Sequence, residues 1–291
     1  DPLELIEKYG ADGVRMGMML SAPAGNDILF DDALCEQGRN FCNKIWNAFR
    51  LIKGWTNGKS SIPVPPEAHL AVQWFDQRLD AAAVEVADLF SKYRLSEALM
   101  LVYKLFWDEF SSWLLEIVKP AYGQPINGFI YSMVLSSFER LLELLHPFMP
   151  FITEEIFCTL HPEEDTIMLA KWPEYRADWN FPAEEEMLEH CKDLVKGVRN
   201  VRTEMDVPPS RKAKIFIVSD DAKIRDTFES NKEVYVNLAG ASEIAVQADK
   251  TGIEEDAVSV VIPGATLYLP LEDLVDFEKE KERLLKEQAR L

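Results

Sequence analysis

Five side chains between residues 39 and 50 have the chemistry to bind an anionic partner that also forms hydrogen bonds. Arg39, Lys44 and Arg50 supply positive charge, and Asn43 and Asn47 supply amides that both donate and accept hydrogen bonds. Asn side chains can read the edges of nucleic-acid bases, and Lys and Arg side chains neutralise phosphates. These residue types therefore indicate the binding of a nucleic acid rather than a catalytic step.

The stretch that carries these residues differs in charge from the rest of the chain. The 291 residues contain 31 Lys and Arg against 50 Asp and Glu, so the formal net charge is −19. Residues 37–66 nevertheless contain no acid, and their basic residues are Arg39, Lys44, Arg50, Lys53 and Lys59. Because phosphate repels an acidic surface at long range, a general DNA binder is excluded and any nucleic-acid contact must be local.

A helix over residues 38–53 would place these side chains on one face. At about 100° per residue, its apolar side gathers Phe41, Cys42, Ile45, Ala48, Phe49 and Ile52. The opposite side gathers Arg39, Asn40, Asn43, Lys44, Asn47 and Arg50, with Trp46 and Leu51 at the borders. Asn is a poor helix former, and an acid-free face lacks stabilising i,i+4 Glu–Lys pairs. We therefore predict a nucleic-acid contact surface; the alternative is an amphipathic helix with solvated Lys and Arg.

A second basic row lies on the helix predicted to begin at Glu184 and to end near Met205. Lys196, Arg199 and Arg202 share one side of it, in a window without acids. We consider Arg199 and Arg202 as additional RNA contacts. The alternative is a structural helix, since acids near its N-terminus and basic residues in its second half suit the helix dipole.

The remaining composition indicates a globular protein without a metal site. A hydrophobic content of 47% over 291 residues is enough for a large core and two or more units. The four cysteines form no CxxC pair, so we expect free, buried thiols in a reducing cytosol, and the four histidines are scattered. With no signal peptide and no apolar run of about 20 residues, we expect a cytoplasmic protein without a membrane partner.

The hydrophobic pattern predicts a mainly α-helical chain. Two short helices over residues 1–22 precede the basic helix, and further helices are expected at 68–91, 95–118, 129–145 and 151–160. Consecutive helices without a strand predict an antiparallel helix bundle, in which the aromatic stripes are packing residues. Three prolines in residues 161–182 predict an irregular segment that wraps the bundle.

After residue 182 the pattern changes to a small α+β unit. We expect strands at 213–218 and 243–247, and a hairpin of residues 258–262 and 266–269 that turns at Pro263-Gly264-Ala265. The apolar spacing of Leu274, Phe277, Leu284 and Leu291 predicts the start of a coiled coil. We therefore divide the chain into residues 1–32, 33–181, 182–270 and 271–291. A first residue other than Met and an end inside a charged repeat predict a piece of a longer protein.

Several segments, in order, are similar to one family. These are DPLELIEKYGADGVR, PAGNDILFD, GRNFCNKIWNAFR, LLHPFMPFITEEIF, RNVRTEMDVPP and FEKEKERLLKEQARL. They resemble the C-terminal portion of valyl-tRNA synthetases, which are class I aminoacyl-tRNA synthetases, after the KMSKS loop. ADGVR at residues 11–15 is similar to the ADALR pattern of related enzymes, with changes at Gly13 and Val14.

The resemblance implies a function for each part. Residues 1–32 would contact the tRNA stem region, residues 33–181 would bind the anticodon, and residues 271–291 would begin an arm that contacts the outer corner of tRNA. Lys44 and Asn47 would contact bases or phosphates, and Arg39, Asn43 and Arg50 would contact the loop backbone. The position of Leu51 is often aromatic in the family and packs on an anticodon base, which a leucine can cover only by apolar contact.

The resemblance also implies what the chain does not carry. The full-length enzyme joins valine to its tRNA using ATP with Mg, but the ATP, valine and editing sites precede this segment, so no catalytic residue or cofactor is expected here. We expect a monomer that binds valine tRNA, with no DNA partner. The alternatives are the matching region of isoleucyl-tRNA synthetases, which typically ends in a zinc module, and a non-catalytic acidic scaffold that binds proteins.

Overall fold

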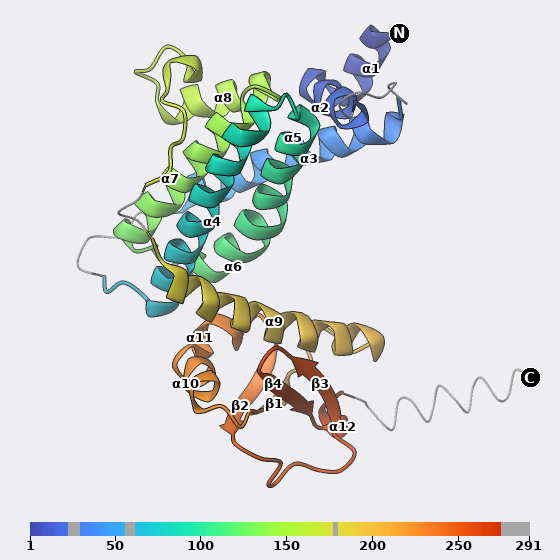
Figure 1. Ribbon diagram of the computed structural model, residues 1–291, viewed down its shortest axis with the longest axis vertical. Coiled ribbons are helices and arrows are strands. Elements are labelled where there is room, and N and C mark those ends of the chain that lie inside the picture. The colour runs from blue at the N-terminus through green and yellow to red at the C-terminus, as the bar shows by residue number, and fades with distance from the viewer. Residues whose placement is uncertain (23–29, 56–61, 177–179, 275–291) are drawn as a thin grey trace, which may run out of the picture. The chain divides into compact units, whose positions relative to one another are not determined.

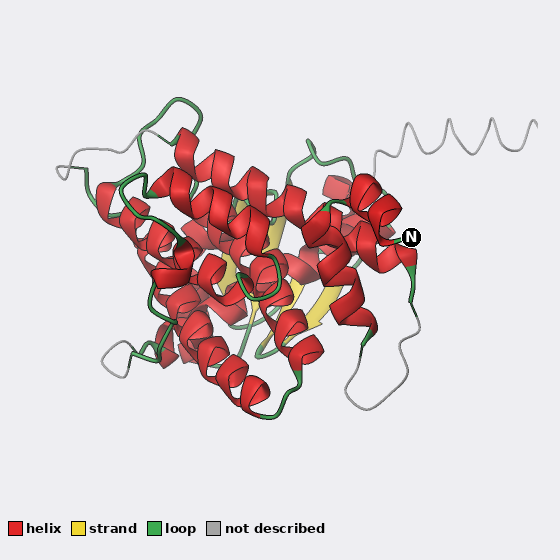
Figure 2. Ribbon diagram, turned by 90° about the horizontal axis from the view of Figure 1, so that it is seen from above, coloured by secondary structure: helices red, strands yellow, loops and turns green. Residues whose placement is uncertain are grey.

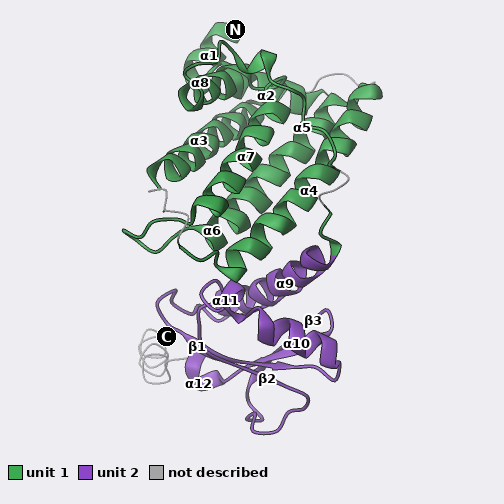
Figure 3. Cartoon of the chain, turned by 90° about the vertical axis from the view of Figure 1, so that its left-hand side faces the viewer, with its two compact units in different colours: residues 1–182 green, residues 183–291 purple. Residues whose placement is uncertain are grey.

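The computed structural model describes residues 1–22, 30–55, 62–176 and 180–274, and it is mainly helical (Figure 1). The chain divides into two compact units, residues 1–182 and 183–291, which Figure 3 colours separately. The fold class predicted from the sequence, a helix bundle followed by a small α+β unit, is confirmed. Within the described residues, no helix is long and apolar enough to cross a membrane.

Unit 1 begins with two short helices that pack on the basic helix. Helix α1 spans Pro2–Tyr9, capped by Asp1, whose side chain accepts a hydrogen bond of 2.9 Å from the Leu3 amide. Helix α2 spans Ala11–Ser21 and crosses α3, Asp32–Gly54, at close range. A Cβ atom on Gly17 would lie 2.6 Å from the Cys35 Sγ, and one on Gly38 would lie 2.5 Å from the Gly13 carbonyl oxygen. The crossing therefore requires glycine at these positions.

The helices that come next in unit 1 form the predicted bundle. Its elements are α3, α4 (Pro66–Ser91), α5 (Leu95–Lys104), the π-helix η1 (Leu105–Leu114), α6 (Leu115–Val118), α7 (Gly128–Leu145), α8 (Pro150–Leu160) and the 3-10 turn η2 (Ile167–Leu169). Helix α4 packs against both α5 and α7. The core contains fully buried aromatic residues from four of these elements: Phe41, Trp74, Phe75, Phe106, Phe110 and Phe138. Most of the predicted aromatic stripe is thus packing, but residues 95–118 are not one uninterrupted α-helix.

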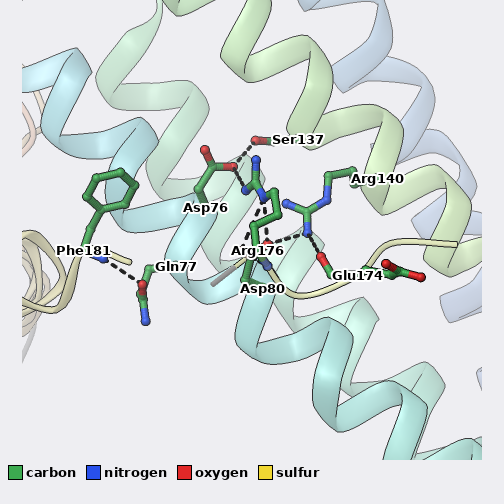
Figure 4. A network of polar contacts seen from close by, with 8 residues as sticks. All are labelled: Asp76, Gln77, Asp80, Ser137, Arg140, Glu174, Arg176 and Phe181. Carbon is green, nitrogen blue, oxygen red and sulfur yellow. Dashed lines mark hydrogen bonds and ion pairs between the residues drawn. The ribbon is translucent and has the colours of Figure 1, made fainter. Parts of the chain in front are cut away.

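The segment after α8 is held against the bundle by buried ionic contacts (Figure 4). Asp76 and Asp80 of α4 are almost fully buried, and Arg176 approaches both carboxylates at 3.3 Å. Arg140 of α7 pairs with Asp80, and the Phe181 amide donates to the Gln77 side chain at 2.9 Å. Because a buried charge without a partner is strongly destabilising, these pairs fix the path of the segment.

Unit 2 is a helix and a four-stranded sheet with short additional helices. Its elements are α9 (Pro182–Glu204), β1 (Ala213–Val218), α10 (Ala222–Ser230), α11 (Lys232–Tyr235), β2 (Ala241–Gln247), β3 (Val258–Ile262), β4 (Ala265–Leu269) and α12 (Leu271–Leu274). The strand order is β2-β1-β4-β3, with β1 and β2 parallel and the other neighbours antiparallel. Figure 2 shows these strands gathered in one sheet.

Local chemistry explains how α9 and the hairpin are placed in unit 2. A Cβ on Gly197 of α9 would lie 3.1 Å from a Val260 methyl and 3.3 Å from an Ile262 methyl, so this helix packs closely on the sheet. The predicted hairpin turn is confirmed, since Gly264 has a φ of 78° between β3 and β4. The predicted coiled coil falls mostly on residues 275–291, which lie outside the described residues; Leu274 is buried at the end of α12.

Candidate nucleic-acid interface

The face of α3 predicted to be polar is largely exposed. Asp31 caps the helix by accepting a hydrogen bond of 2.9 Å from the Ala33 amide, and Phe41, Ile45 and Ile52 are buried on the core side. On the other side the exposed residues are Asn40, Asn43, Asn47, Arg50 and Leu51, and the half-buried residues are Arg39 and Lys44. The helical period thus brings the predicted residues to one side of α3.

Two of the cations on this face have partners within the protein. The Arg39 guanidinium lies 2.9 Å from the Glu36 carboxylate and 5.7 Å from the centre of the Tyr9 ring. The Lys44 ammonium lies 5.1 Å from the centre of the Trp107 ring. Exposed ion pairs contribute at most about 1 kcal/mol, so Glu36 reduces the local positive charge without locking Arg39 in place.

The remaining polar groups face solvent without a partner inside the described residues. Over residues 1–22, 30–55, 62–176 and 180–274, no hydrogen bond or ion pair engages the side chains of Asn43, Asn47 or Arg50. An exposed Asn in a helix interior is less favourable than Ala by up to about 0.7 kcal/mol. The structure therefore provides no stabilising contact that explains these asparagines, and their donors and acceptors are open to a ligand.

The two border residues of this face differ in chemistry. Leu51 is 39% exposed and Trp46 is 38% exposed, so both can make apolar contact with a partner. The Trp46 ring lies against Phe49, with ring centres 5.3 Å apart. Leu51 has no π-face, so this border position of α3 offers only aliphatic surface.

The basic residues of α9 are used differently. Arg202 is 9% exposed, and its guanidinium donates to the carbonyl oxygens of Pro208 at 3.0 Å and Arg211 at 2.6 Å. Arg199 is exposed and donates to the Leu238 carbonyl at 3.1 Å, and Lys196 pairs with Asp193 at 3.5 Å. A cavity of about 580 Å³ lies beside these arginines. The Arg202 side chain thus connects the end of α9 to the turns that follow. It is not exposed, as an RNA contact would have to be.

The described residues contain no arrangement suited to metal or thiol chemistry. No group of three or more His, Cys, Asp or Glu side chains among them could hold a metal ion. Cys35, Cys42, Cys158 and Cys191 are free, but only Cys35 and Cys191 are fully buried, whereas all four were expected to be. Burial raises the pKa of the Cys42 and Cys191 thiols to about 12, so neither is a reactive thiolate near neutral pH.

Sequence reasoning missed two aromatic residues at the edge of α3. Tyr103 and Trp107 are half-buried, and their ring centres lie 4.8 Å and 6.3 Å from that of Phe41. Trp107 was assigned to core packing because an α-helical period was assumed over residues 95–118, and Tyr103 was not singled out. The π-helical turn that begins at Leu105 has no signal in the sequence, so their position beside Lys44 could only come from the structure.

Two relatives of this chain are valine–tRNA ligases. A valine–tRNA ligase of Bacteroides fragilis is 58% identical over 98% of this chain, and one of Parabacteroides distasonis is 49% identical over 99%. The chain spans 32% of the length of each, so it matches about a third of these proteins, and both alignments are long enough to include α3.

A more distant similarity links the chain to a solved structure. The ternary complex of LeuRS, tRNA and LeuAMS from Agrobacterium radiobacter K84 has a TM-score of 0.45 and 17% identity over 62% of this chain and 21% of that one. This similarity is too low to support an inference. The profile of the anticodon-binding domain of tRNA ligase, in contrast, matches residues 72–217, half of the chain, and on this match the chain belongs to the family of tRNA ligases that carry this domain.

Proposed function

We propose that this chain is the tRNA-binding portion of a valine–tRNA ligase and that the exposed face of α3 contacts the anticodon loop of valine tRNA. The observation that carries the proposal is the chemistry of that face: Asn43, Asn47 and Arg50 are exposed and unpaired within the described residues, in a stretch without acids. The identity to valine–tRNA ligases across almost the whole chain supports the choice of tRNA.

Each side chain has a role that fits its position. Asn47 and Lys44 lie one turn apart and contact base edges or phosphates, while Asn43, Arg39 and Arg50 contact the backbone of the loop. Unpaired loop bases are the usual targets of sequence-specific RNA recognition, because their edges are free for hydrogen bonds. Leu51 covers a base by apolar contact. Arg199 on α9, which is exposed, is a second contact of lesser weight.

The reaction itself belongs to the full-length protein in this proposal. A valine–tRNA ligase attaches valine to tRNA with ATP and Mg, and no catalytic residue is assigned to this chain. The chain alone binds tRNA as a monomer in the cytoplasm and does not aminoacylate it. We expect an affinity in the micromolar range or weaker, because much of the contact area of a protein about three times as long is absent.

The test is a comparison of two RNAs. The affinity of the chain for valine tRNA and for the same tRNA with a substituted anticodon is measured by fluorescence anisotropy at two salt concentrations. We expect tighter binding of the native tRNA, with an affinity that falls as salt rises because counterions are released from phosphates. Equal affinity for the two tRNAs would contradict anticodon recognition, and the absence of any tRNA binding would contradict the proposed function as a whole.

A further inference from the structure

An aromatic pair lies at the border where the polar face of α3 meets the core of unit 1. The centres of the Tyr103 and Trp107 rings are 5.6 Å apart, and the rings are tilted against each other at an interplanar angle of 32°. Phe41, fully buried on α3, packs edge-on against Tyr103, with ring centres 4.8 Å apart, and contacts the pair from the core side. Both rings of the pair are half-buried and therefore present part of their surface to solvent.

The π-helical segment η1 places Trp107 at this border. The Trp107 carbonyl accepts a hydrogen bond of 2.9 Å from the Ser112 hydroxyl, five residues ahead. On either side of Trp107, Phe106 and Phe110 are fully buried, whereas Trp107 itself stays at the surface. π-Helical turns are rare and occur frequently at functional sites.

Polar groups of α3 surround the exposed part of the pair. Lys44 lies with its ammonium 5.1 Å from the centre of the Trp107 ring. Side chains three and four residues apart are neighbours on a helix, so Asn40 and Asn47 flank Lys44 on its solvent side, and both are exposed. Leu51 continues the same row by one further turn. An aromatic face, a cation and two amides thus lie within one small area.

The acidic residues next to Trp107 face another element. Asp108 and Glu109 line a cavity of about 270 Å³ with residues of α4. Glu109 accepts two hydrogen bonds of 2.9 Å from the Arg78 guanidinium, so its charge is paired. These carboxylates therefore do not occupy the side of η1 that faces Lys44, and an anionic ligand can approach there.

We propose that Trp107, supported by Tyr103, is a stacking platform for one unpaired base of an RNA loop, and that Lys44, which lies over the ring in the free chain, moves to a phosphate when the base stacks. Aromatic side chains stack on bases of any sequence, and an adjacent amide can read the edge of the stacked base. This inference rests on the proposed function and deepens it. The π-face that Leu51 cannot supply on α3 is supplied by the neighbouring helix.

The experiment uses an anticodon stem–loop RNA of valine tRNA with a fluorescent purine analogue at each loop position in turn. In the unaltered chain, one position should show fluorescence quenching on binding, because stacking on an indole quenches such analogues. Trp107→Leu should weaken binding about 5- to 100-fold and abolish the quenching, while Trp107→Phe should stay within about 3-fold of the unaltered chain. The matched control is Trp172→Leu, another partly exposed tryptophan of unit 1, which should change neither.

The outcomes separate the platform from the wider proposal. If the unaltered chain binds the stem–loop but Trp107→Leu binds equally well and keeps the quenching, the proposed stacking on Trp107 is wrong. The proposed binding of RNA by α3 is then unaffected. If the unaltered chain does not bind the RNA, both fail. Should Trp107→Leu not fold, ultraviolet cross-linking in the unaltered chain decides: the analogue should cross-link to the peptide that contains Trp107, and a cross-link confined to other peptides overturns the platform.

Discussion

Helices α3 and α9 are each 23 residues long and each carries a row of basic side chains in a window without acids. On α3, Arg50 of this row and the neighbouring Asn43 and Asn47 are exposed and have no partner within the described residues. On α9 the Arg202 guanidinium is buried against carbonyl oxygens of the turns that follow. Similar sequence patterns thus leave an open polar face on one helix and place a buried arginine against the backbone in the other.

The difference lies in the backbone that each helix meets. The chain after α9 turns back at Asp206, which has a φ of 56°, and reaches β1 through Pro208 and Pro209, so backbone carbonyl oxygens surround Arg202. The outer face of α3 meets no such turn within the described residues. The availability of carbonyl acceptors, more than local charge, decides whether an arginine remains open to a ligand.

The largest effect is expected from Arg202→Met. This change removes the guanidinium donors from the carbonyl oxygens of Pro208, Arg211 and Gly240, of which Pro208 and Gly240 keep a backbone donor. We expect unit 2 to lose about 1–3 kcal/mol of stability. All seven tryptophans lie before residue 183, so their fluorescence reports unit 1, whereas circular dichroism reports both units. In urea, the circular dichroism transition should move to lower concentration while the fluorescence midpoint stays unchanged.

Arg199→Met is the matched control for this change. Arg199 is exposed, and its substitution should alter the unfolding midpoint far less than that of Arg202. The contrast between α3 and α9 would break down if Arg202→Met left the stability of unit 2 intact and weakened RNA binding.

The next largest effect is expected from Asn47→Ala, which should lower RNA affinity but raise the stability of unit 1. Asn47→Ala removes a proposed RNA contact and should weaken binding to the stem–loop by about 5-fold. Since Ala is the better helix former, the same change should stabilise unit 1 by up to about 0.7 kcal/mol. Binding is measured by anisotropy and stability by urea unfolding followed by tryptophan fluorescence.

Asn200→Ala, at an exposed position of α9, is the control for Asn47→Ala. It should give a similar gain in helix stability with unchanged RNA affinity. An equal loss of RNA affinity in both variants would show that exposed asparagines contribute to RNA binding on either helix, which would contradict a binding face confined to α3.

A smaller effect is expected from Arg50→Gln. Arg50 is exposed and contacts the RNA backbone in the proposal, so its loss should weaken binding about 3-fold at low salt and should act on all loop sequences alike. The slope of log affinity against log salt should become shallower by about 0.7, the value for one phosphate of a single strand. An unchanged slope would remove Arg50 from the phosphate contacts.

The smallest perturbation tests only the orientation of α3. Burial raises the pKa of the Cys42 thiol to about 12, so at pH 8 it holds very little thiolate and should resist alkylation in the folded chain. A cysteine introduced by Asn43→Cys, one residue further on, should react at least about 100-fold faster, and bound RNA should protect it. Equal reaction rates, followed by mass spectrometry, would mean that α3 does not present the face described.

Helical periodicity alone predicted much of the fold and the outer face of α3. The apolar residues Phe41, Ile45 and Ile52 fix which side of the helix is buried, and this information is local. The pairing of Arg39 with Glu36 is also local, since the acid lies just outside the acid-free stretch.

Contacts between distant segments could not be predicted in the same way. Trp107 lies 63 positions after Lys44, and it reaches α3 through a π-helical turn whose hydrogen bonds depend on the surrounding bundle. The partners of Arg202 are backbone carbonyls that carry no residue-specific signal. Sequence reasoning therefore placed Trp107 in the core, where it is only half-buried, and considered Arg202 as a possible RNA contact, whereas its side chain is buried.

The most direct test of RNA recognition by α3 is the ratio of affinities for native and anticodon-substituted stem–loops, measured for the unaltered chain and for the double variant Asn43→Ala with Asn47→Ala. The account predicts that the unaltered chain prefers the native loop and that the double variant, which keeps Lys44 and Arg50, binds both loops weakly and equally. Full discrimination in the double variant would contradict it.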